Sequence, residues 1–449
     1  MAAPPPFQVA LSDEYDPSIP RILPHEHVFS IQVGYKMFKL SGASLSSDAP
    51  SYFTNFFSHE RNDKVLFIDR DPRTFGKIYN HLQGYVVEVD NEYDFVHLWS
   101  DSFYFGLENL QKYLQTHFIF ASVGSKTFKI DRTLISGKGN FPNFFTISND
   151  SILGDNFKLI EEKKLFRPPP QRPICAPNRS AILFADVLEL LTGNDLIIKN
   201  DEHRSLLLRE CRYYRFLELE QRIIKSRIYN NPFQEGIQEI ILNLNDLQSK
   251  GIFNASTSKL SEQPIQYARP YLLNEPKRIL VFQVDTIELS KGFSLMKLIL
   301  NKKEKMALVK LKGDLCIKFM QVFKAYQEHF RVENRESKNP TITLITGLAD
   351  CQAIINGLEM KKDWVEDILC GPNLVDVTSD EGFKRLHEEQ HFPKKRKYSE
   401  DSPSEIIEFM LTKSLWKLVM RGNMSRLHCI SFDAIADQKS FTKKVKDFL

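Results

Sequence analysis

The residues best suited to chemistry in this sequence form a His-Glu-x-x-His pattern near the C-terminus. His387 and His391 are four residues apart, and Glu388 follows the first histidine. On a helix this spacing places two imidazoles on one face, where they bind zinc while the glutamate acts as a general base. The residues between them are polar, however, and Pro393 ends a helix almost at once. We interpret the pattern as an exposed polar helix end rather than a metal site, and zinc hydrolysis is kept as an alternative.

A cluster of four cations follows directly after Pro393 in a stretch that favours a loop. The cluster consists of Lys394, Lys395, Arg396 and Lys397. Such a run resembles a nuclear-import signal, because an extended basic segment exposes each charge to the acidic groove of an import receptor. Ser402 precedes a proline beside acidic residues, and its phosphorylation would place negative charge close to the cations. The alternative to an import signal is a solvated basic loop.

Composition limits the classes of function that the chain serves. Its 449 residues predict about three domains of roughly 150 residues each. The 60 Lys and Arg residues nearly balance the 57 Asp and Glu residues, which argues against nucleic acid as a partner. Apolar runs are too short to span a bilayer, and the N-terminus lacks the pattern of a signal peptide. We therefore expect no membrane partner, and a location in the nucleus, the cytoplasm or both.

Other signatures of catalysis are missing. The sequence contains no GxxxxGK[ST], no GxSxG and no GxGxxG pattern. Its six cysteines are scattered and include no CxxC pair, so neither a disulfide framework nor a cysteine zinc site is expected. We predict a protein without a cofactor that is not an enzyme.

An internal repeat organises the first half of the chain. Ile31–Leu40 aligns with Ala121–Ile130 at a shift of 90, with five of ten positions identical. Phe75–Lys112 aligns without gaps with Phe184–Gln221 at a shift of 109. The extra residues of the second copy fall at about 146–177, where a proline-rich stretch predicts an exposed, extended loop. A duplicated domain explains these matches, and chance similarity is the alternative.

The elements of the first copy follow from local chemistry. Val28–Val33 and Met37–Leu40 are β-type runs, and Gly34-Tyr35 between them indicates a hairpin. Asp71 is suited to cap a helix that begins at Pro72, because a proline at the first helical position loses no hydrogen bond.

Three ordered motifs then carry a resemblance to a known family. Residues from about 28 to 113 resemble the BTB/POZ fold in its T1 or KCTD-like branch, that of the potassium-channel tetramerisation domain. The motifs are Val33–Phe38 (VGYKMF), Phe67–Pro72 (FIDRDP) and Tyr104–Leu107 (YFGL). Residues 118–232 resemble a second, degenerate copy. The whole chain is also similar to fungal proteins with two BTB domains in tandem.

The resemblance implies an interaction module rather than an enzyme, one that assembles with further copies of itself. By analogy, Asp69, Arg70 and Asp71 would contribute ion pairs between subunits, although capping alone explains Asp71 equally well. Many family members are adaptors of cullin-ring ubiquitin ligases. A homo-oligomeric scaffold or adaptor, regulatory and at least partly nuclear, is therefore the leading hypothesis. A cullin adaptor and a signalling adaptor for a phosphatase are the alternatives.

The chain is thus predicted to be α+β, with tandem BTB/POZ-like domains followed by a C-terminal α+β domain of no recognised family. In the last segment, Ile406, Phe409 and Met410 predict an amphipathic helix over Glu405–Met420. The predicted divisions are a flexible tail (1–24), the BTB/POZ domain (25–117), its degenerate copy (118–232), a connecting segment and linker (233–266), the α+β domain (267–392), a basic and acidic linker (393–404) and a helical segment (405–449).

Overall fold

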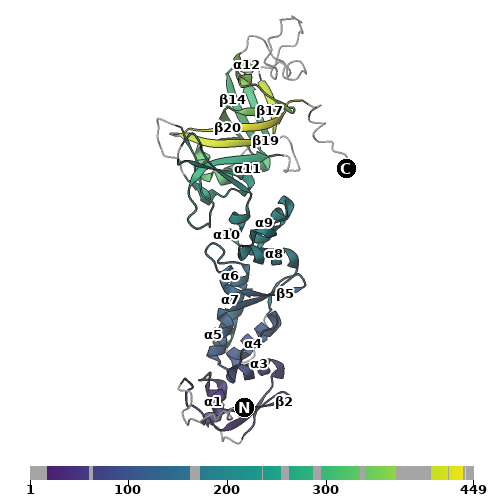
Figure 1. The fold of residues 1–449 in the computed structure, drawn as a ribbon, viewed down its shortest axis with the longest axis vertical. Coiled ribbons are helices and arrows are strands. Elements are labelled where there is room, and N and C mark those ends of the chain that lie inside the picture. Colours follow the sequence, from purple (N-terminus) through teal and green to yellow (C-terminus); the bar gives the residue numbers. More distant parts are fainter. Residues whose placement is uncertain are drawn as a thin grey trace, which may run out of the picture. The chain divides into compact units, whose positions relative to one another are not determined.

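The computed structural model folds into two compact units, Met1–Ile223 and Ile224–Leu449 (Figure 1). Both units contain helices and strands, as an α+β chain requires. None of the helices in the described ranges combines the length and hydropathy that a membrane span needs. The structure describes residues 18–59, 64–161, 172–234, 236–253, 262–286, 295–333, 339–370, 406–422, 424–437 and 440.

The first module of the N-terminal unit spans Val28–Thr116 and begins with the predicted hairpin. Strands β1 (Val28–Val33) and β2 (Lys36–Ser41) pair antiparallel, and β3 (Leu66–Ile68) pairs parallel to β1. Gly34 in the connecting turn has a φ of +55°, which a side chain would strain. The helices are α1 (Gly42–Ser46), α2 (Tyr52–His59), α3 (Pro72–Leu82), α4 (Glu92–Tyr104) and α5 (Glu108–Thr116).

The core of this module lies between the sheet and the helices. Alternate residues of β1 point inward and are fully buried, and Phe75 of α3 packs edge-on against Phe38 and Phe105. These contacts give a role to several of the 34 phenylalanines of the chain, because large aromatic side chains supply a small domain with much of its buried apolar surface.

A second module, Phe118–Ile223, repeats this strand pairing. Strands β4 (Phe118–Val123) and β5 (Lys126–Asp131) pair antiparallel, and β6 (Ile174–Ala176) is parallel to β4. The order β5-β4-β6 therefore matches β2-β1-β3. The helices are α6 (Arg132–Ile135), α7 (Phe144–Glu161), α8 (Ala181–Leu191), α9 (Asp201–Tyr214) and α10 (Leu217–Ile223), with a 3-10 turn at Asp195–Ile197.

The loop predicted for 146–177 is wrong over its first half and at its end. Residues up to Glu161 continue α7, and Ile174–Ala176 form strand β6. The prolines that suggested a loop begin only at Pro168, so they place no restriction on the preceding residues. Phe145 and Ile152 of α7 are buried, which ties this helix to the core of the module.

In the C-terminal unit, 14 strands among the described residues form one sheet. The pairings β16–β14–β13–β19–β20–β16 close on themselves in a ring, and α11 (Gly313–Val322) packs against β14 and β16. A second helix, α12, spans Trp364–Cys370. The strands are β7 (Ser226–Asn230), β8 (Gln238–Asn243), β9 (Ile252–Phe253), β10 (Gln263–Pro264), β11 (Gln266–Tyr267), β12 (Arg278–Asp285), β13 (Met296–Asn301), β14 (Met306–Lys312), β15 (Arg331–Glu333), β16 (Thr341–Gly347), β17 (Gln352–Ile355), β18 (Leu358–Glu359), β19 (Ile406–Arg421) and β20 (Met424–Ile435).

The helix predicted over Glu405–Met420 is wrong, and the helical segment predicted for 405–449 is wrong over its described residues up to Ile435, while most of its last residues lie outside the described ranges. Ile406–Arg421 form the long strand β19, which pairs with β12, β13 and β20. Figure 1 shows β19 and β20 running side by side. Register shifts in its pairing with β20, between Leu411 and Lys413 and between Leu415 and Trp416, change the phase of its buried positions, so its apolar residues lose the simple alternation that marks a regular strand.

The segment predicted to connect the domains also contributes strands to this sheet. β8 lies parallel to β12, and β10 and β11 pair with β19 and β12. β7, which precedes this segment, pairs with β8 and so belongs to the C-terminal unit rather than to the second module. Short strands of mixed polarity carry no clear local signal, because their partners lie far away in the sequence.

Candidate protein-interaction site

The loop between β3 and α3 holds the three residues that the resemblance assigned to an oligomer interface. Asp71 caps α3, because its carboxylate accepts hydrogen bonds of 3.1 Å from both the backbone N–H and the hydroxyl of Thr74. Burial would raise the pKa of Asp71, but these hydrogen bonds outweigh it and lower the pKa. Asp69 is exposed at the same loop. The cap predicted for Asp71 is therefore confirmed.

Arg70 lies in the same loop and is held within its own module. Its Nη1 atom is 2.5 Å from Oδ1 of Asp101 in α4, and its guanidinium lies 4.0 Å from the centre of the Tyr104 ring. The Asp101 side chain is only 8% exposed. Burial raises the pKa of Asp101, and the nearby Arg70 opposes that rise. Arg70 thus neutralises a buried carboxylate and ties the loop to α4.

The second module repeats this arrangement with different residues. Arg179 Nη1 lies 3.3 Å from Oε1 of Glu210, and its guanidinium is 3.7 Å from the centre of the Tyr213 ring. All three residues lie 109 positions after Arg70, Asp101 and Tyr104. We define these two groups as the Arg-carboxylate-Tyr clusters. The sequence alignment paired the two tyrosines, but we did not predict a role for the two carboxylates. The same ungapped alignment places Asp101 opposite Glu210.

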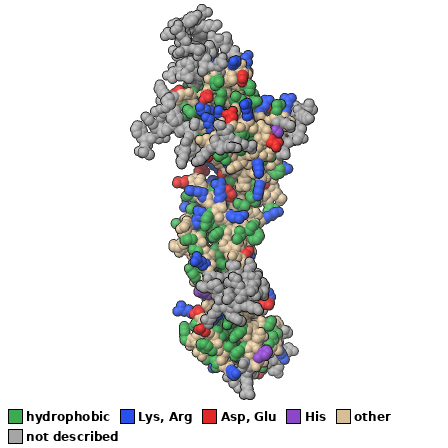
Figure 2. Space-filling model, turned by 180° about the vertical axis from the view of Figure 1, so that it is seen from behind, with side chains coloured by type: hydrophobic (Ala, Val, Ile, Leu, Met, Phe, Trp, Pro, Cys, Tyr) green, Lys and Arg blue, Asp and Glu red, His purple; other side chains and the backbone are tan. Residues whose placement is uncertain are grey.

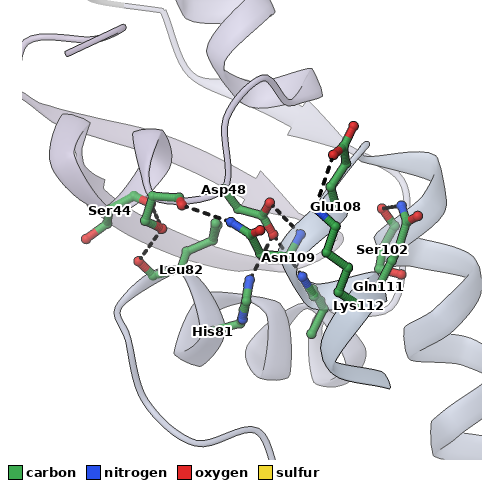
Figure 3. Close-up of polar contacts among 11 residues, drawn as sticks. Ser44, Asp48, His81, Leu82, Ser102, Glu108, Asn109, Gln111 and Lys112 are labelled. Atoms are coloured by element: carbon green, nitrogen blue, oxygen red, sulfur yellow. Dashed lines mark hydrogen bonds and ion pairs between the residues drawn. The ribbon is translucent and has the colours of Figure 1, made fainter. Parts of the chain in front are cut away.

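A further polar network joins α3 and α5 of the first module through Asp48. The Asp48 carboxylate accepts hydrogen bonds from the backbone N–H groups of Asn109 (2.9 Å) and Leu110 (3.1 Å) at the start of α5. Figure 3 shows His81 turned toward it from α3, with Nε2 at 2.9 Å from Oδ2. Burial would raise the pKa of Asp48, but the contacts with His81 and the backbone lower it. Sequence reasoning did not identify this network.

In the second module an asparagine, Asn140, binds the start of the last helix in the way that Asp48 does in the first. Asn140 Oδ1 accepts hydrogen bonds of 3.1 Å from the backbone N–H groups of Glu218 and Leu219, which begin α10. Its amide nitrogen donates to the Glu218 carboxylate at 3.0 Å. Both networks therefore anchor the start of the last helix of a module.

The two modules meet where α4 packs against β4 and α7. The Thr127 hydroxyl donates a 2.8 Å hydrogen bond to the carboxylate of Glu92, which is only 6% exposed. One turn later, the ring of Phe95 stacks on Phe120 with 5.7 Å between their centres, and both rings are buried. A helix of the first module thus covers the sheet of the second. This contact is an interaction surface built into the chain.

The remaining predicted site residues lie outside the described residues. They are His387, Glu388, His391, Lys394, Lys395, Arg396, Lys397 and Ser402. Within the described part of the chain, no group of three or more His, Cys, Asp or Glu side chains could hold a metal ion.

Comparison with known proteins extends the similarity across both units. Residues 263–445 match the family model described as the YLR108C C-terminal domain. The chain is 27% identical to the Saccharomyces cerevisiae BTB/POZ domain-containing protein YLR108C, over 96% of each chain. It is 33% identical to the Saccharomyces cerevisiae protein YDR132C, over 98% of each chain. Identity at that level along nearly the full length of both proteins shows that the chain belongs to the family of YDR132C.

Proposed function

We propose that this protein is a non-catalytic interaction scaffold or adaptor with two BTB-like modules in tandem, the second of them degenerate, of the T1/KCTD-like type. The observation that carries the proposal is the packing of α4 on the second sheet, through Phe95 on Phe120 and Glu92 on Thr127. Two modules with the same strand pairing associate there through a helix and a sheet face. The BTB/POZ name of the relative YLR108C supports the same function.

The scaffold is further proposed to assemble with copies of itself. The exposed Asp69 is the residue of the predicted interface that suits a test, because Arg70 and Asp71 hold structure within the module. Light scattering should give a mass above that of a 52.2 kDa monomer, and Asp69→Lys should lower it. A strictly monomeric wild-type chain at micromolar concentration would remove self-association from the proposal.

Partners from a regulatory pathway are proposed in place of a substrate. A cullin and a signalling phosphatase are the two classes that the family resemblance suggests, and an import receptor would bind Lys394–Lys397. Affinity purification followed by mass spectrometry distinguishes them. Recovery of a cullin would support an adaptor of a ubiquitin ligase, and recovery of a phosphatase a signalling adaptor. If neither is enriched over a tag-only control, both adaptor roles are lost.

A further inference from the structure

Two cysteines that are distant in the sequence lie together in the C-terminal unit. Cys351 lies in the turn between β16 and β17, and Cys429 lies in β20. Both are free thiols, and their exposed fractions are only 9% and 5%. On the face of this unit that Figure 2 shows, Lys, Arg, Asp and Glu side chains are interspersed, whereas the two thiols belong to the core. Neither the spacing of the cysteines nor the charged surface therefore indicates this pair.

The strand register places the two thiols side by side. β17 and β20 pair parallel, with Ala353 opposite Phe432, and both of these side chains are buried. The preceding buried positions are Cys351, directly before β17, and Cys429, because Ile430 is the extra residue of an irregularity in the pairing of β20 with β19. Adjacent strands lie about 4.8 Å apart, which falls within the Cα separation of about 4.4–6.8 Å that a disulfide needs.

A hydrogen bond joins the two side chains. Burial raises the pKa of Cys429 well above its ordinary value, and the hydrogen bond that this thiol donates to Cys351 raises it further. The Cys351 thiol in turn donates to the carbonyl oxygen of Gln352, with 3.7 Å between sulfur and oxygen. A bond between the two sulfur atoms therefore requires a rotation of the side chains and no movement of the strands.

We propose that Cys351 and Cys429 form a reversible disulfide when the protein meets a low-molecular-weight disulfide such as oxidised glutathione. The pair is thus an oxidative modification site of the C-terminal unit. Its bond would fasten the start of the hairpin β17–β18, which lies at one end of the strand order, to β20. The inference goes beyond the proposed scaffold function and does not depend on it.

The reaction consists of two thiol–disulfide exchanges. Cys351 loses its proton, and its sulfur attacks one sulfur of oxidised glutathione, which breaks that S–S bond, forms a mixed disulfide and releases one glutathione. The sulfur of Cys429 then loses its proton, attacks the sulfur of Cys351 and releases the second glutathione. The protein thereby loses two electrons, which reduce the small disulfide, and the two protons end on the two glutathione thiols.

The positions of the two cysteines set the order of these steps. Cys351 reacts first, because it lies in a turn, whereas Cys429 lies in a strand that has partners on both sides. The raised pKa of Cys429 slows the second exchange. That exchange is intramolecular, however, and the contact between the two side chains offsets the scarcity of the thiolate.

Chemical mapping of the folded, full-length chain tests the pairing. The Cys175→Ser variant removes an exposed thiol, so five of the six cysteines remain. This protein is reduced, incubated with oxidised glutathione, unfolded and alkylated, and its peptides are mapped by mass spectrometry without reduction. We expect a linked peptide that joins Cys351 to Cys429, at least about tenfold more abundant than any other protein disulfide, because the fold holds these sulfurs together. Incubation in urea should abolish the preference, and dithiothreitol should reverse the bond.

Two other buried thiols provide the matched control. Cys211 in α9 and Cys316 in α11 are fully buried, and burial raises the pKa of each, so both should be alkylated after unfolding. In Cys429→Ser, the mixed disulfide of Cys351 with glutathione should accumulate, because no second thiol releases it. The linked peptide itself is measured in a protein that keeps both core cysteines, so it does not depend on how well this variant folds.

Three results would overturn the proposal. The first is that Cys351 and Cys429 are both alkylated after incubation of the folded protein with oxidised glutathione. The second is a mixed disulfide at Cys351 that persists although Cys429 is present. The third is an equal preference for this pair in urea, because the fold would then play no part in bringing the two thiols together.

Discussion

At the scale of single residues, the pairing of Arg70 with Asp101 makes a sharp prediction. Asp101 is nearly buried, and without its cation the ionised carboxylate would lack compensation. Arg70→Met should therefore lower the free energy of unfolding by about 3 kcal/mol, measured by urea denaturation of the intact protein. Adding Asp101→Asn to this variant should restore part of the loss, because the charge that needs a partner is then gone.

The second Arg-carboxylate-Tyr cluster is the matched control. Arg179 lies farther from Glu210, at 3.3 Å, and is 30% exposed, so Arg179→Met should cost less than Arg70→Met. Strictly additive effects of Arg70→Met and Asp101→Asn in a double-mutant cycle would show that the two side chains are not coupled and would contradict the first prediction.

Asp48 predicts how stability depends on pH. Its pKa is lowered in the folded protein, so its ionised form stabilises the fold above the ordinary pKa of about 3.9, and this contribution is lost as pH falls through the lower folded value. Asp48→Asn keeps the acceptor that Asn140 uses in the second module but removes the charge beside His81. It should cost about 1–2 kcal/mol at pH 7 and progressively less below about pH 4.

The measurement is urea denaturation of both proteins at a series of pH values, with Asn140→Asp as the reverse exchange. A difference in stability between wild type and Asp48→Asn that stays constant from pH 7 to pH 3 would contradict a role for the charge.

The sequence predicted the cap at Asp71, whose partner is three residues away. It did not predict the partners of Asp48 or Asp101, which lie 31 to 62 residues away and meet only in the folded chain.

At the scale of elements, strand β19 predicts where the C-terminal unit is most sensitive. Trp416 is fully buried in a strand that pairs with β12, β13 and β20, so its side chain fills space that no neighbour can easily recover. Trp416→Ala should destabilise the protein by about 3–5 kcal/mol, measured by chemical denaturation. Lys413→Ala in the same strand is the control and should change stability by less than about 0.5 kcal/mol, because Lys413 is exposed. Similar losses from both would contradict the buried central position of β19.

The same strand explains which elements the sequence could predict. Val28–Val33 alternates between buried and partly exposed positions, and the helix from Pro72 has an explicit cap, so local rules place both. Around β19 the apolar residues Ile406, Phe409 and Met410 satisfy a helical spacing equally well. The extended form is selected by pairing, both with β20, which follows directly, and with strands more than 100 residues away, as the register of Phe409 with Leu298 illustrates. Local propensity alone therefore does not distinguish a strand from a helix here.

At the scale of the whole molecule, the repeat predicted two related modules, but it did not reveal that they pack together. Phe95 and Phe120 lie 25 residues apart and belong to different copies, so neither the alignment nor the periodicity relates them. The contact depends on a difference between the copies, since Phe95 has an arginine as its counterpart in α9. A repeat identifies the residues that two copies share. The packing of these two copies depends instead on a position at which they differ.

Charge distribution supplies the last prediction. The formal charge of the whole chain is only +3, so general attraction to nuclear material would be weak, and the proposed location in the nucleus depends on a local signal. Replacing Lys394–Lys397 with alanine should therefore shift a tagged protein from nucleus to cytoplasm, as followed by fluorescence microscopy. Ser402→Glu should shift it in the same direction, because it adds negative charge beside the cations, and Ser402→Ala should not.

Replacing Lys302 and Lys303, a basic pair in the turn between β13 and β14, is the control for loss of charge alone. An unchanged distribution in the Lys394–Lys397 variant, or an equal shift in this control, would mean that these four residues are a solvated loop without an import function.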